Sequence, residues 1–413
     1  MSSIVIMAGG TGGHVFPGLA VADELSSRGW TVNWFGTADK MEAATVPKYG
    51  YPIHFIDIAG VRGKGLTHKL MTPFKLVKAV IASRRLLKKL KPKVVLGMGG
   101  YASGPGAIAA YTLGIPLVLH EQNAIFGLTN RYLSKLAALV LCGFNMQINR
   151  DHNKAPASAL FVGNPIRRVF ADIPEKVRQS DANDKCEAIN ILIVGGSLGA
   201  LALNQIVPKV LKDISSAKVL NVWHQSGKGK AEPVKEAYQA LFAQPLLKDT
   251  EDFASAGNAS EAGVQVRVSE FIDKVESAYA WADIVICRAG ALTVAEVSAA
   301  GRVAVFVPLP IAVDDHQTFN AQNLSEQGAA ILIQQHDLAE QLPVHLHRLV
   351  AEPSVRYEIA RKAKSLAQMN ATRDVADYCA SLIGNGMALN NSANDLNKVS
   401  KINKKESTTN EQD

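Results

Sequence analysis

Residues 283–323 read DIVICRAGALTVAEVSAAGRVAVFVPLPIAVDDHQTFNAQN, and the architecture of the chain can be worked out from them. The apolar run Ile284–Cys287 predicts a buried strand. A helix is then expected from Ala291 to Gly301, where glycine suits a left-handed cap. Val303–Val307 predicts a second buried strand, because β-branched side chains dominate it. The stretch therefore indicates a βαβ unit in a parallel sheet.

The turn before the expected helix suits an anion. The unpaired N–H groups of the first helical turn and the helix dipole together attract phosphate. Glu296, one and a half turns into the helix, could accept the two hydroxyls of a ribose. Asp314–Gln317 bring further polar groups to the same sheet edge. The segment thus fits a nucleotide clamp, with an ordinary βαβ unit and a solvated Glu296 as the open alternative.

Composition favours a folded protein with two α/β domains, since the chain has 413 residues, 47% of them hydrophobic and 20% charged. Four cysteines lie far apart without a CxxC pair, so neither a zinc site nor a disulfide framework is expected, as in a reducing cytosol. The start MSSIVIMAGG favours a strand over a signal peptide. Residues 94–119 are uncharged but rich in glycine and proline, which argues against a membrane span.

A glycine-rich turn, AGGTGGH at 8–14, follows the first predicted strand, Ile4–Met7. It does not fit a dinucleotide fingerprint, because Val15 stands where the third glycine would fall and the next strand ends without an acid. The glycines instead allow a bulky ligand to approach the backbone. His14, at the helix start, could accept a proton. A structural histidine is the alternative.

Two further strand ends carry polar groups. MGGYASGPG at 98–106 is a second glycine-rich turn, and HEQN at 120–123 follows the strand Pro116–Leu119. In open parallel sheets the ligand crevice lies at the carboxyl ends of the strands. We therefore expect one rim to carry His14, Tyr101, Glu121 and Asn123.

A helix with a basic stripe beside an apolar stripe is predicted from about His68 to Leu90. Such a helix can lie on a membrane surface, or it can be a core helix with a solvated basic face. Nucleic acid is disfavoured, because no interleaved aromatic platform or known nucleic-acid module accompanies the charges. The predicted membrane contacts are Leu66, Leu70, Phe74, Lys75, Lys78, Arg85 and Lys89.

The second half of the chain repeats the architecture of the first. GGSLG at 195–199 follows the strand Ile189–Val194, and Ser197 could bind a phosphate oxygen or cap the next helix. Phe271 and Ile272 could form one side of a pocket for a nucleobase. Residues 246–263 are polar and fit a surface insertion.

Six blocks of sequence, in this order along the chain, resemble the MurG family of bacterial cell-wall glycosyltransferases. They are AGGTGGHVFPGLA (8–20), MGGYASGPG (98–106), HEQNAIFGLTNR (120–131), GNPIR (163–167), GGSLGA (195–200) and CRAGALTVAE (287–296). The resemblance spans about residues 2–380. It implies an α/β protein of the GT-B fold, with two Rossmann-like domains whose parallel sheets face a central cleft.

The resemblance also implies an inverting N-acetylglucosaminyltransferase of peptidoglycan synthesis. N-acetylglucosamine would pass from UDP-N-acetylglucosamine (UDP-GlcNAc) to the C4 hydroxyl of undecaprenyl-pyrophosphoryl-N-acetylmuramoyl-pentapeptide (lipid I), giving lipid II. No cofactor is implied. The implied location is peripheral, at the cytoplasmic face of the bacterial inner membrane. Implied partners are the two substrates, an anionic membrane surface, and cell-wall or division proteins, but no nucleic acid.

Motif by motif, the resemblance assigns roles to single residues. Glu296 would hold the ribose, the backbone of Ile272 the uracil, Ser197 and the helix from Ala291 the pyrophosphate, and Gln317 the sugar. The implied donor contacts are Thr11, Gly12, Gly13, Asn123, Arg167, Ser197, Ile272, Ala291, Leu292, Thr293, Val294, Ala295, Glu296 and Gln317. His14, Tyr101 and Glu121 would face the acceptor, with His14 as the expected catalytic base and Glu121 in reserve.

The chain departs from the family pattern at Ala124, at Leu198 and around residues 244–263. Asp314-Asp315 is not a DxD motif at a strand end, so no metal clamp is expected, and the helix dipole and Arg167 would stabilise the leaving group. Three rivals stay open: a UDP-GlcNAc 2-epimerase, a non-catalytic UDP-sugar-binding membrane scaffold, and, least supported, a nicotinamide oxidoreductase.

We expect four segments. Residues 1–163 form the acceptor- and membrane-facing domain and residues 164–355 the donor domain. Residues 356–384 are helices that pack back on the first domain, and residues 385–413 are a disordered tail.

Overall fold

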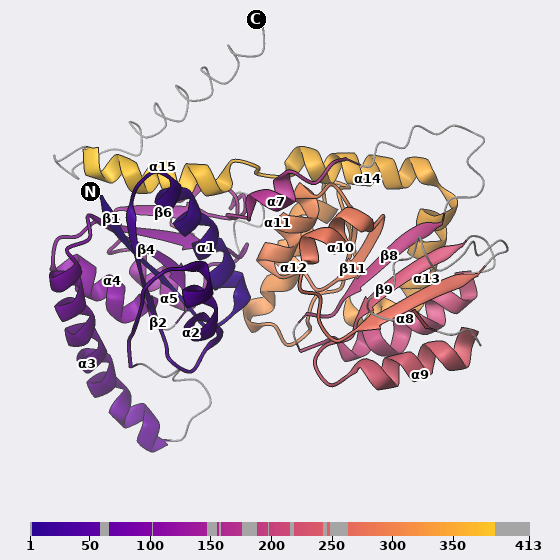
Figure 1. Ribbon diagram of the computed structural model, residues 1–413, viewed down its shortest axis with the longest axis horizontal. Coiled ribbons are helices and arrows are strands. Elements are labelled where there is room, and N and C mark those ends of the chain that lie inside the picture. Colours follow the sequence, from indigo (N-terminus) through magenta and orange to yellow (C-terminus); the bar gives the residue numbers. More distant parts are fainter. Residues whose placement is uncertain are drawn as a thin grey trace, which may run out of the picture.

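The computed structural model describes residues 2–57, 66–100, 102–146, 155–156, 158–175, 188–196, 198–214, 219–242, 246–247 and 263–384. The described chain forms two α/β domains (Figure 1). Tyr101, Ser197, most of the expected insertion and the expected tail from residue 385 lie outside these ranges, and the side chains of Leu66 and Leu70 are likewise not described.

The N-terminal domain contains a parallel sheet in the order β3-β2-β1-β4-β5-β6-β7. In chain order its elements are β1 (Ser3–Ala8), α1 (Gly12–Ser27), β2 (Thr31–Gly36), α2 (Met41–Thr45), η1 (Val46–Tyr49), β3 (Ile53–Phe55), α3 (Leu66–Leu90), β4 (Val94–Gly99), α4 (Ser103–Thr112), β5 (Leu117–Glu121), α5 (Leu128–Leu133), β6 (Leu139–Cys142) and β7 (Leu160–Phe161). The central strands are buried on both faces, because Ile4 and Ile6 pack in one apolar cluster and Val5 and Met7 in the other. This burial explains why these strands are continuous apolar runs.

The C-terminal domain contains a second parallel sheet in the order β10-β9-β8-β11-β12-β13. Its elements are α7 (Arg168–Ala171), β8 (Ile189–Val194), α8 (Leu201–Ile214), β9 (Leu220–Gln225), α9 (Ala231–Phe242), β10 (Val264–Ser269), α10 (Val275–Trp281), β11 (Ile284–Cys287), α11 (Ala291–Ala299), β12 (Val303–Phe306), η2 (Val313–Asp315), α12 (His316–Ser325), β13 (Ile331–Leu332), η3 (Gln335–Asp337), α13 (Leu338–Ala351) and α14 (Pro353–Leu366). Both sheets reverse their strand order beside the first strand of the domain, and such switch points are where ligands bind in doubly wound folds.

The βαβ unit predicted from residues 283–323 is confirmed. The strand β11 covers the predicted residues and is buried throughout, and α11 begins at Ala291 as expected. Gly301 has a φ of +60°, the left-handed conformation that the helix cap requires. Asp314 and Asp315 are left-handed as well, and they turn the chain sharply into α12.

The last two helices divide between the domains. In Figure 1, α14 lies across the C-terminal domain and packs against α11 and α13, whereas α15 (Ala371–Gly384) crosses to the N-terminal domain and packs on α1. Val375, Ala376 and Cys379 of α15 are part of an apolar cluster of the N-terminal domain. Of the predicted segment 356–384, α15 packs on the first domain, whereas the part in α14 packs on the C-terminal domain. The predicted domain boundaries stay a prediction.

The helix α3 is partly uncovered. Phe74, Val77 and Ile81 are 72%, 58% and 45% exposed, while Ala79 and Leu87 are buried against the N-terminal domain. The basic side chains predicted beside them, Lys75, Lys78, Arg85 and Lys89, are exposed. Within the described chain, no helix is long and apolar enough to cross a membrane.

Candidate active site

The first glycine-rich turn is held by a buried carboxylate that the sequence motif did not reveal. Glu42 is fully buried, and its carboxylate accepts hydrogen bonds from the backbone N–H of Gly10 (2.9 Å), the backbone N–H of Thr37 (2.9 Å) and the Thr37 hydroxyl (2.7 Å). A Cβ on Gly9 would lie 2.4 Å from Glu42 Oε1, so a larger residue there would displace the Glu42 carboxylate from its hydrogen bonds. Glu42 lies on the short helix α2, outside any recognisable motif, and fixes the turn from the side.

His14 lies in the first turn of α1, with its ring against Gly99 at the end of β4. Its Nδ1 faces the carbonyl oxygen of Gly9 (3.3 Å) and the Thr11 hydroxyl (3.4 Å). A carbonyl oxygen only accepts, so the hydrogen is placed on Nδ1 and Nε2 keeps its lone pair. Burial lowers the pKa of His14, and the nearby Glu121 opposes that shift. This arrangement suits a neutral imidazole that accepts a proton through Nε2.

Glu121, at the end of β5, organises the loop that follows it. Its buried carboxylate accepts hydrogen bonds from the Asn123 backbone (3.1 Å) and side chain (3.2 Å), the Gly127 backbone (3.1 Å) and the Asn130 side chain (2.8 Å). With both oxygens engaged, Glu121 would have to give up a hydrogen bond to take a proton. The geometry therefore favours His14 over Glu121 as the base, with Glu121 in a supporting place.

On the C-terminal domain, a buried acid and an arginine lie near one another. Glu296 is 8% exposed, burial raises its pKa to about 8, and Arg167 lowers it in part. No described residue donates a hydrogen bond to the Glu296 carboxyl group. Arg167 pairs with Glu276 at 3.1 Å and has its guanidinium over the ring of Phe170, 4.8 Å from the centroid. Like Glu42, Glu276 lies outside any recognised sequence motif and yet contacts a predicted site residue, Arg167.

The N-terminus of α11 is open, as predicted. Gly290 is its N-cap, with no side-chain cap, so the amides of the first turn keep their capacity for an anion. Ile272 is buried beside this helix in the same apolar cluster. The carboxamide oxygen of Gln317 accepts from the backbone N–H of Leu309 at 3.0 Å, which orients that side chain. Arg288 has a structural role, because its guanidinium donates hydrogen bonds to the carbonyl oxygens of Val307 and Pro308.

Thr11, Gly12 and Gly13 lie at the start of α1, and Asn123 lies in the loop after β5. The described structure thus brings the predicted N-terminal residues to the carboxyl end of one sheet and the predicted residues 291–296 to the carboxyl end of the other. Among the described residues, no group of three histidine, cysteine or acidic side chains is placed to hold a metal ion.

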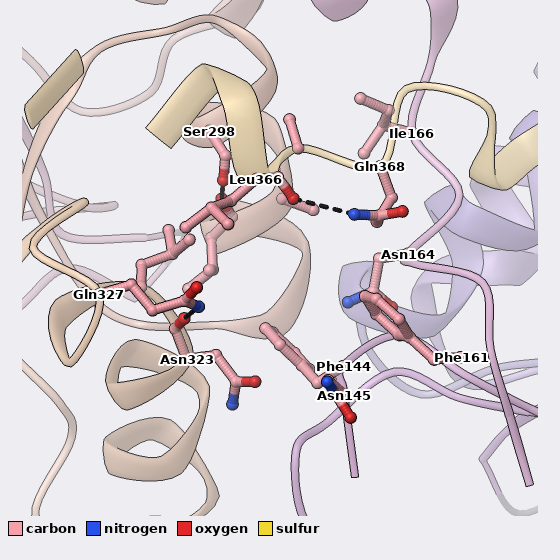
Figure 2. A pocket seen from close by; sticks show the side chains of 15 residues that line it. Phe144, Asn145, Phe161, Asn164, Ile166, Ser298, Asn323, Gln327, Leu366 and Gln368 are labelled. Carbon is pink, nitrogen blue, oxygen red and sulfur yellow. Dashed lines mark hydrogen bonds between the residues drawn. The ribbon is translucent and has the colours of Figure 1, made fainter. Parts of the chain in front are cut away.

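A cavity of about 180 Å³ lies where the two domains meet (Figure 2). Figure 2 shows its lining from both domains: Phe144, Asn145, Phe161, Asn164 and Ile166 face Ser298, Asn323 and Gln327, with Leu366 and Gln368 from the crossing between α14 and α15. Of the predicted site residues only Val294 and Ala295 line it. These two residues of α11 therefore lie at the domain junction.

Comparison with known sequences identifies the family. The profile of the glycosyltransferase family 28 N-terminal domain matches residues 4–142, and that of the glycosyltransferase family 28 C-terminal domain matches residues 190–379. The chain belongs to glycosyltransferase family 28. Family 28 relatives include the UDP-N-acetylglucosamine–N-acetylmuramyl-(pentapeptide) pyrophosphoryl-undecaprenol N-acetylglucosamine transferases of Psychromonas ingrahamii and Tolumonas auensis. They are 47% and 48% identical to this chain, and each alignment covers 92% of this chain and 99% of the relative.

Solved structures agree with the family 28 assignment. The crystal structure of Acinetobacter baumannii MurG matches with a TM-score of 0.74 and 41% identity, over 92% of this chain and all of that one. The GT-B fold predicted from the sequence is therefore confirmed. A UDP-GlcNAc 2-epimerase from Neisseria meningitidis matches with a TM-score of 0.60 at 13% identity, over 92% of this chain and 100% of that one, which is a likeness of fold alone.

Proposed function

We propose that this chain transfers N-acetylglucosamine from UDP-GlcNAc to the C4 hydroxyl of lipid I, with inversion at the anomeric carbon, to make lipid II. The observation that carries the proposal is the near full-length similarity to transferases of that name. The site geometry supports it, because a neutral histidine and an open helix N-terminus lie at the carboxyl ends of the two sheets.

On the donor side, we assign the pyrophosphate to the first-turn amides of α11, where the helix dipole stabilises the departing UDP. Glu296 would accept the ribose hydroxyls, and the backbone of Ile272 would bind the uracil. Arg167 and Gln317 would complete the proposed donor contacts on this side, and Thr11, Gly12, Gly13 and Asn123 would reach the donor from the N-terminal domain. Tyr101 and Ser197 keep their predicted roles on the acceptor and the pyrophosphate.

On the acceptor side, we assign the base to His14. Its Nε2 would take the proton of the C4 hydroxyl as that oxygen attacks the anomeric carbon on the face opposite to UDP. The new glycosidic bond forms as the bond to UDP breaks, and the configuration inverts. The Gly9 carbonyl holds the Nδ1 hydrogen and thereby keeps Nε2 ready to accept. Glu121 supports this step by fixing the loop that contains Asn123.

At the membrane, we propose that α3 contacts the cytoplasmic face of the inner membrane. Its exposed apolar side chains would enter the headgroup region, and its lysines and arginines would face anionic lipid. This position would bring the enzyme to a lipid-linked acceptor. Cell-wall or division proteins stay predicted partners.

The test is transfer of labelled N-acetylglucosamine to a short-chain analogue of lipid I by the purified protein, with and without EDTA. We expect transfer that EDTA does not diminish, because the helix dipole and amides replace a metal clamp. Turnover that stops on chelation and returns only with a divalent ion would contradict the metal-free mechanism. Formation of the 2-epimer without an acceptor, or UDP binding without any turnover, would overturn the proposed reaction itself.

A further inference from the structure

A single buried carboxamide joins the two domains at the candidate site. Asn320 lies on α12 of the C-terminal domain and is 0% exposed. Its Oδ1 accepts a hydrogen bond from the backbone N–H of Ala124 at 2.8 Å, in the N-terminal domain. Its Nδ2 donates to the carbonyl oxygen of Ala289 at 3.1 Å and to Oδ1 of Asn123 at 3.3 Å.

The partners of Asn320 belong to both halves of the site. Asn123 and Ala124 follow β5 in the loop that Glu121 holds, and Ala289 precedes Gly290, the N-cap of α11. A continuous hydrogen-bonded path therefore runs from the Glu121 carboxylate through Asn123 and Asn320 to the backbone at the α11 turn.

Apolar side chains surround Asn320. Ala124, from the N-terminal domain, packs in an apolar cluster of the C-terminal domain together with Ala289, Ala291 and Ala321. Buried polar groups in such surroundings are costly to leave unpaired. A carboxamide fits because it offers one acceptor and two donors in one plane, whereas a carboxylate could not donate to Ala289 or Asn123.

We propose that Asn320 is a positioning residue that locks the loop after β5 to the α11 turn, so that closure of the two domains and the geometry of the donor pocket change together. The expected loss of kcat rests on the proposed transferase function. The expected change in the distance between the domains does not. Its hydrogen bonds within the described chain go to Asn123, Ala124 and Ala289 rather than to His14 or Glu296, so it acts through the loop and the turn that it joins.

The test compares Asn320→Ala and the isosteric Asn320→Asp with Asn190→Ala in the full-length protein. Asn190 is a matched control, since its carboxamide makes two hydrogen bonds of 3.0 Å, to Trp281 and Asn221, within the C-terminal domain. Spin labels at Tyr111→Cys on α4 and Val344→Cys on α13, both exposed, report the distance between the domains. The background carries Cys186→Ser, because Cys142, Cys287 and Cys379 are buried.

We expect Asn320→Ala to broaden the interdomain distance distribution and to lower kcat about 10- to 100-fold, with the Kd for UDP changed less than about threefold. Asn320→Asp should lower kcat further, because its negative charge would face the oxygens of Ala289 and Asn123. It also serves as the second variant if the alanine protein does not fold. Asn190→Ala should leave the distance distribution and kcat unchanged.

An unchanged distance distribution in both Asn320 variants would overturn the proposal. So would the same loss of kcat in Asn190→Ala, because the effect would then follow general stability. If the unsubstituted protein transfers no sugar but Asn320→Ala still broadens the distribution, the proposed function fails while the interdomain lock stands.

Discussion

At the scale of single residues, burial acts on two titratable side chains of the candidate site, His14 and Glu296, and disfavours the charged form of each. The pKa of His14 is lowered, so the imidazole is neutral at physiological pH and can accept a proton. The pKa of Glu296 is raised to about 8, so its carboxyl group resists ionisation until a ligand compensates. The two side chains therefore give pH dependences of different origin.

The first prediction concerns His14. His14→Ala should lower kcat on the order of 10²- to 10⁴-fold, because the acceptor hydroxyl loses its base, while the Kd for UDP stays within about threefold. With UDP-GlcNAc saturating, kcat of the unsubstituted enzyme should fall only below pH 6.5, since the pKa of His14 is depressed. Steady-state kinetics from pH 5 to 9 check both points, with His54→Ala as the control. Near-normal turnover of His14→Ala would refute the assignment.

The second prediction concerns the proton on Glu296. Ribose hydroxyls donate to a carboxylate and favour its charged form, so binding of UDP should release a proton and tighten about tenfold from pH 6 to pH 8. Calorimetry in two buffers of different ionisation enthalpy measures this proton. Glu296→Gln should bind UDP more weakly and without the pH dependence. An unsubstituted protein with the same flat profile would contradict the role of Glu296.

The same carboxyl group affects stability. Its pKa is about 8 in the folded protein against about 4.5 when unfolded, so the folded state binds the extra proton between these values. The free energy of unfolding should therefore fall as pH rises from about 4.5 to 8. Glu296→Gln removes this slope and should be the more stable protein at pH 8, by an amount on the order of 3 kcal/mol. Denaturant titrations at pH 5 and pH 8 provide this check on the second prediction.

At the scale of elements, α3 presents apolar and basic side chains that the rest of the described chain does not cover. Phe74, Val77 and Ile81 lie three and four residues apart and so share one helix face. Exposed apolar residues scattered singly need no explanation, but a row of three beside exposed lysines does. The arrangement favours a surface-bound helix over a helix that is merely solvated.

The third prediction tests this surface. Lys75→Glu with Lys78→Glu should weaken binding to vesicles that contain anionic lipid by at least about tenfold, because each lysine near such a surface contributes roughly 1 kcal/mol. Phe74→Ser should weaken it further through lost apolar burial. Sedimentation with vesicles measures the bound fraction. Val344→Ser, on the equally exposed face of α13, is the control, and equal losses in it would remove the case for α3.

At the scale of the whole molecule, the last helix ties the chain back to its beginning. Apolar packing carries this attachment, since Val375 is fully buried in the N-terminal core. The ion pair between Arg28 and Asp377 is exposed on both sides, so its contribution should be small.

The fourth prediction separates the two contributions. Val375→Ala should lower the free energy of unfolding by about 2 kcal/mol, whereas Asp377→Asn should change it by about 0.5 kcal/mol or less. Chemical denaturation monitored in both proteins measures the difference. A larger loss for Asp377→Asn would show that the ion pair, and not the apolar face, anchors α15.

The sequence by itself determined the elements whose cause is local. Continuous β-branched runs predicted the strands, glycines and prolines marked the turns, and six spaced motifs indicated the family and the fold. The left-handed Gly301 and the open N-terminus of α11 follow from neighbouring residues alone. These features depend on backbone sterics and side-chain periodicity within about ten residues, so they can be predicted without the tertiary structure.

Only the tertiary structure decided which side chains meet across long separations. Glu42 reaches Gly10 from 32 residues away, Arg167 reaches Glu276 from 109, and Asn320 reaches Ala124 from 196. No sequence pattern around a single acidic or amide residue predicts such a distant partner. The role of that residue depends on which surfaces the folded chain buries together. Hydrogen bonds between residues distant in sequence form where packing excludes water, and that is a property of the assembled domains rather than of any segment.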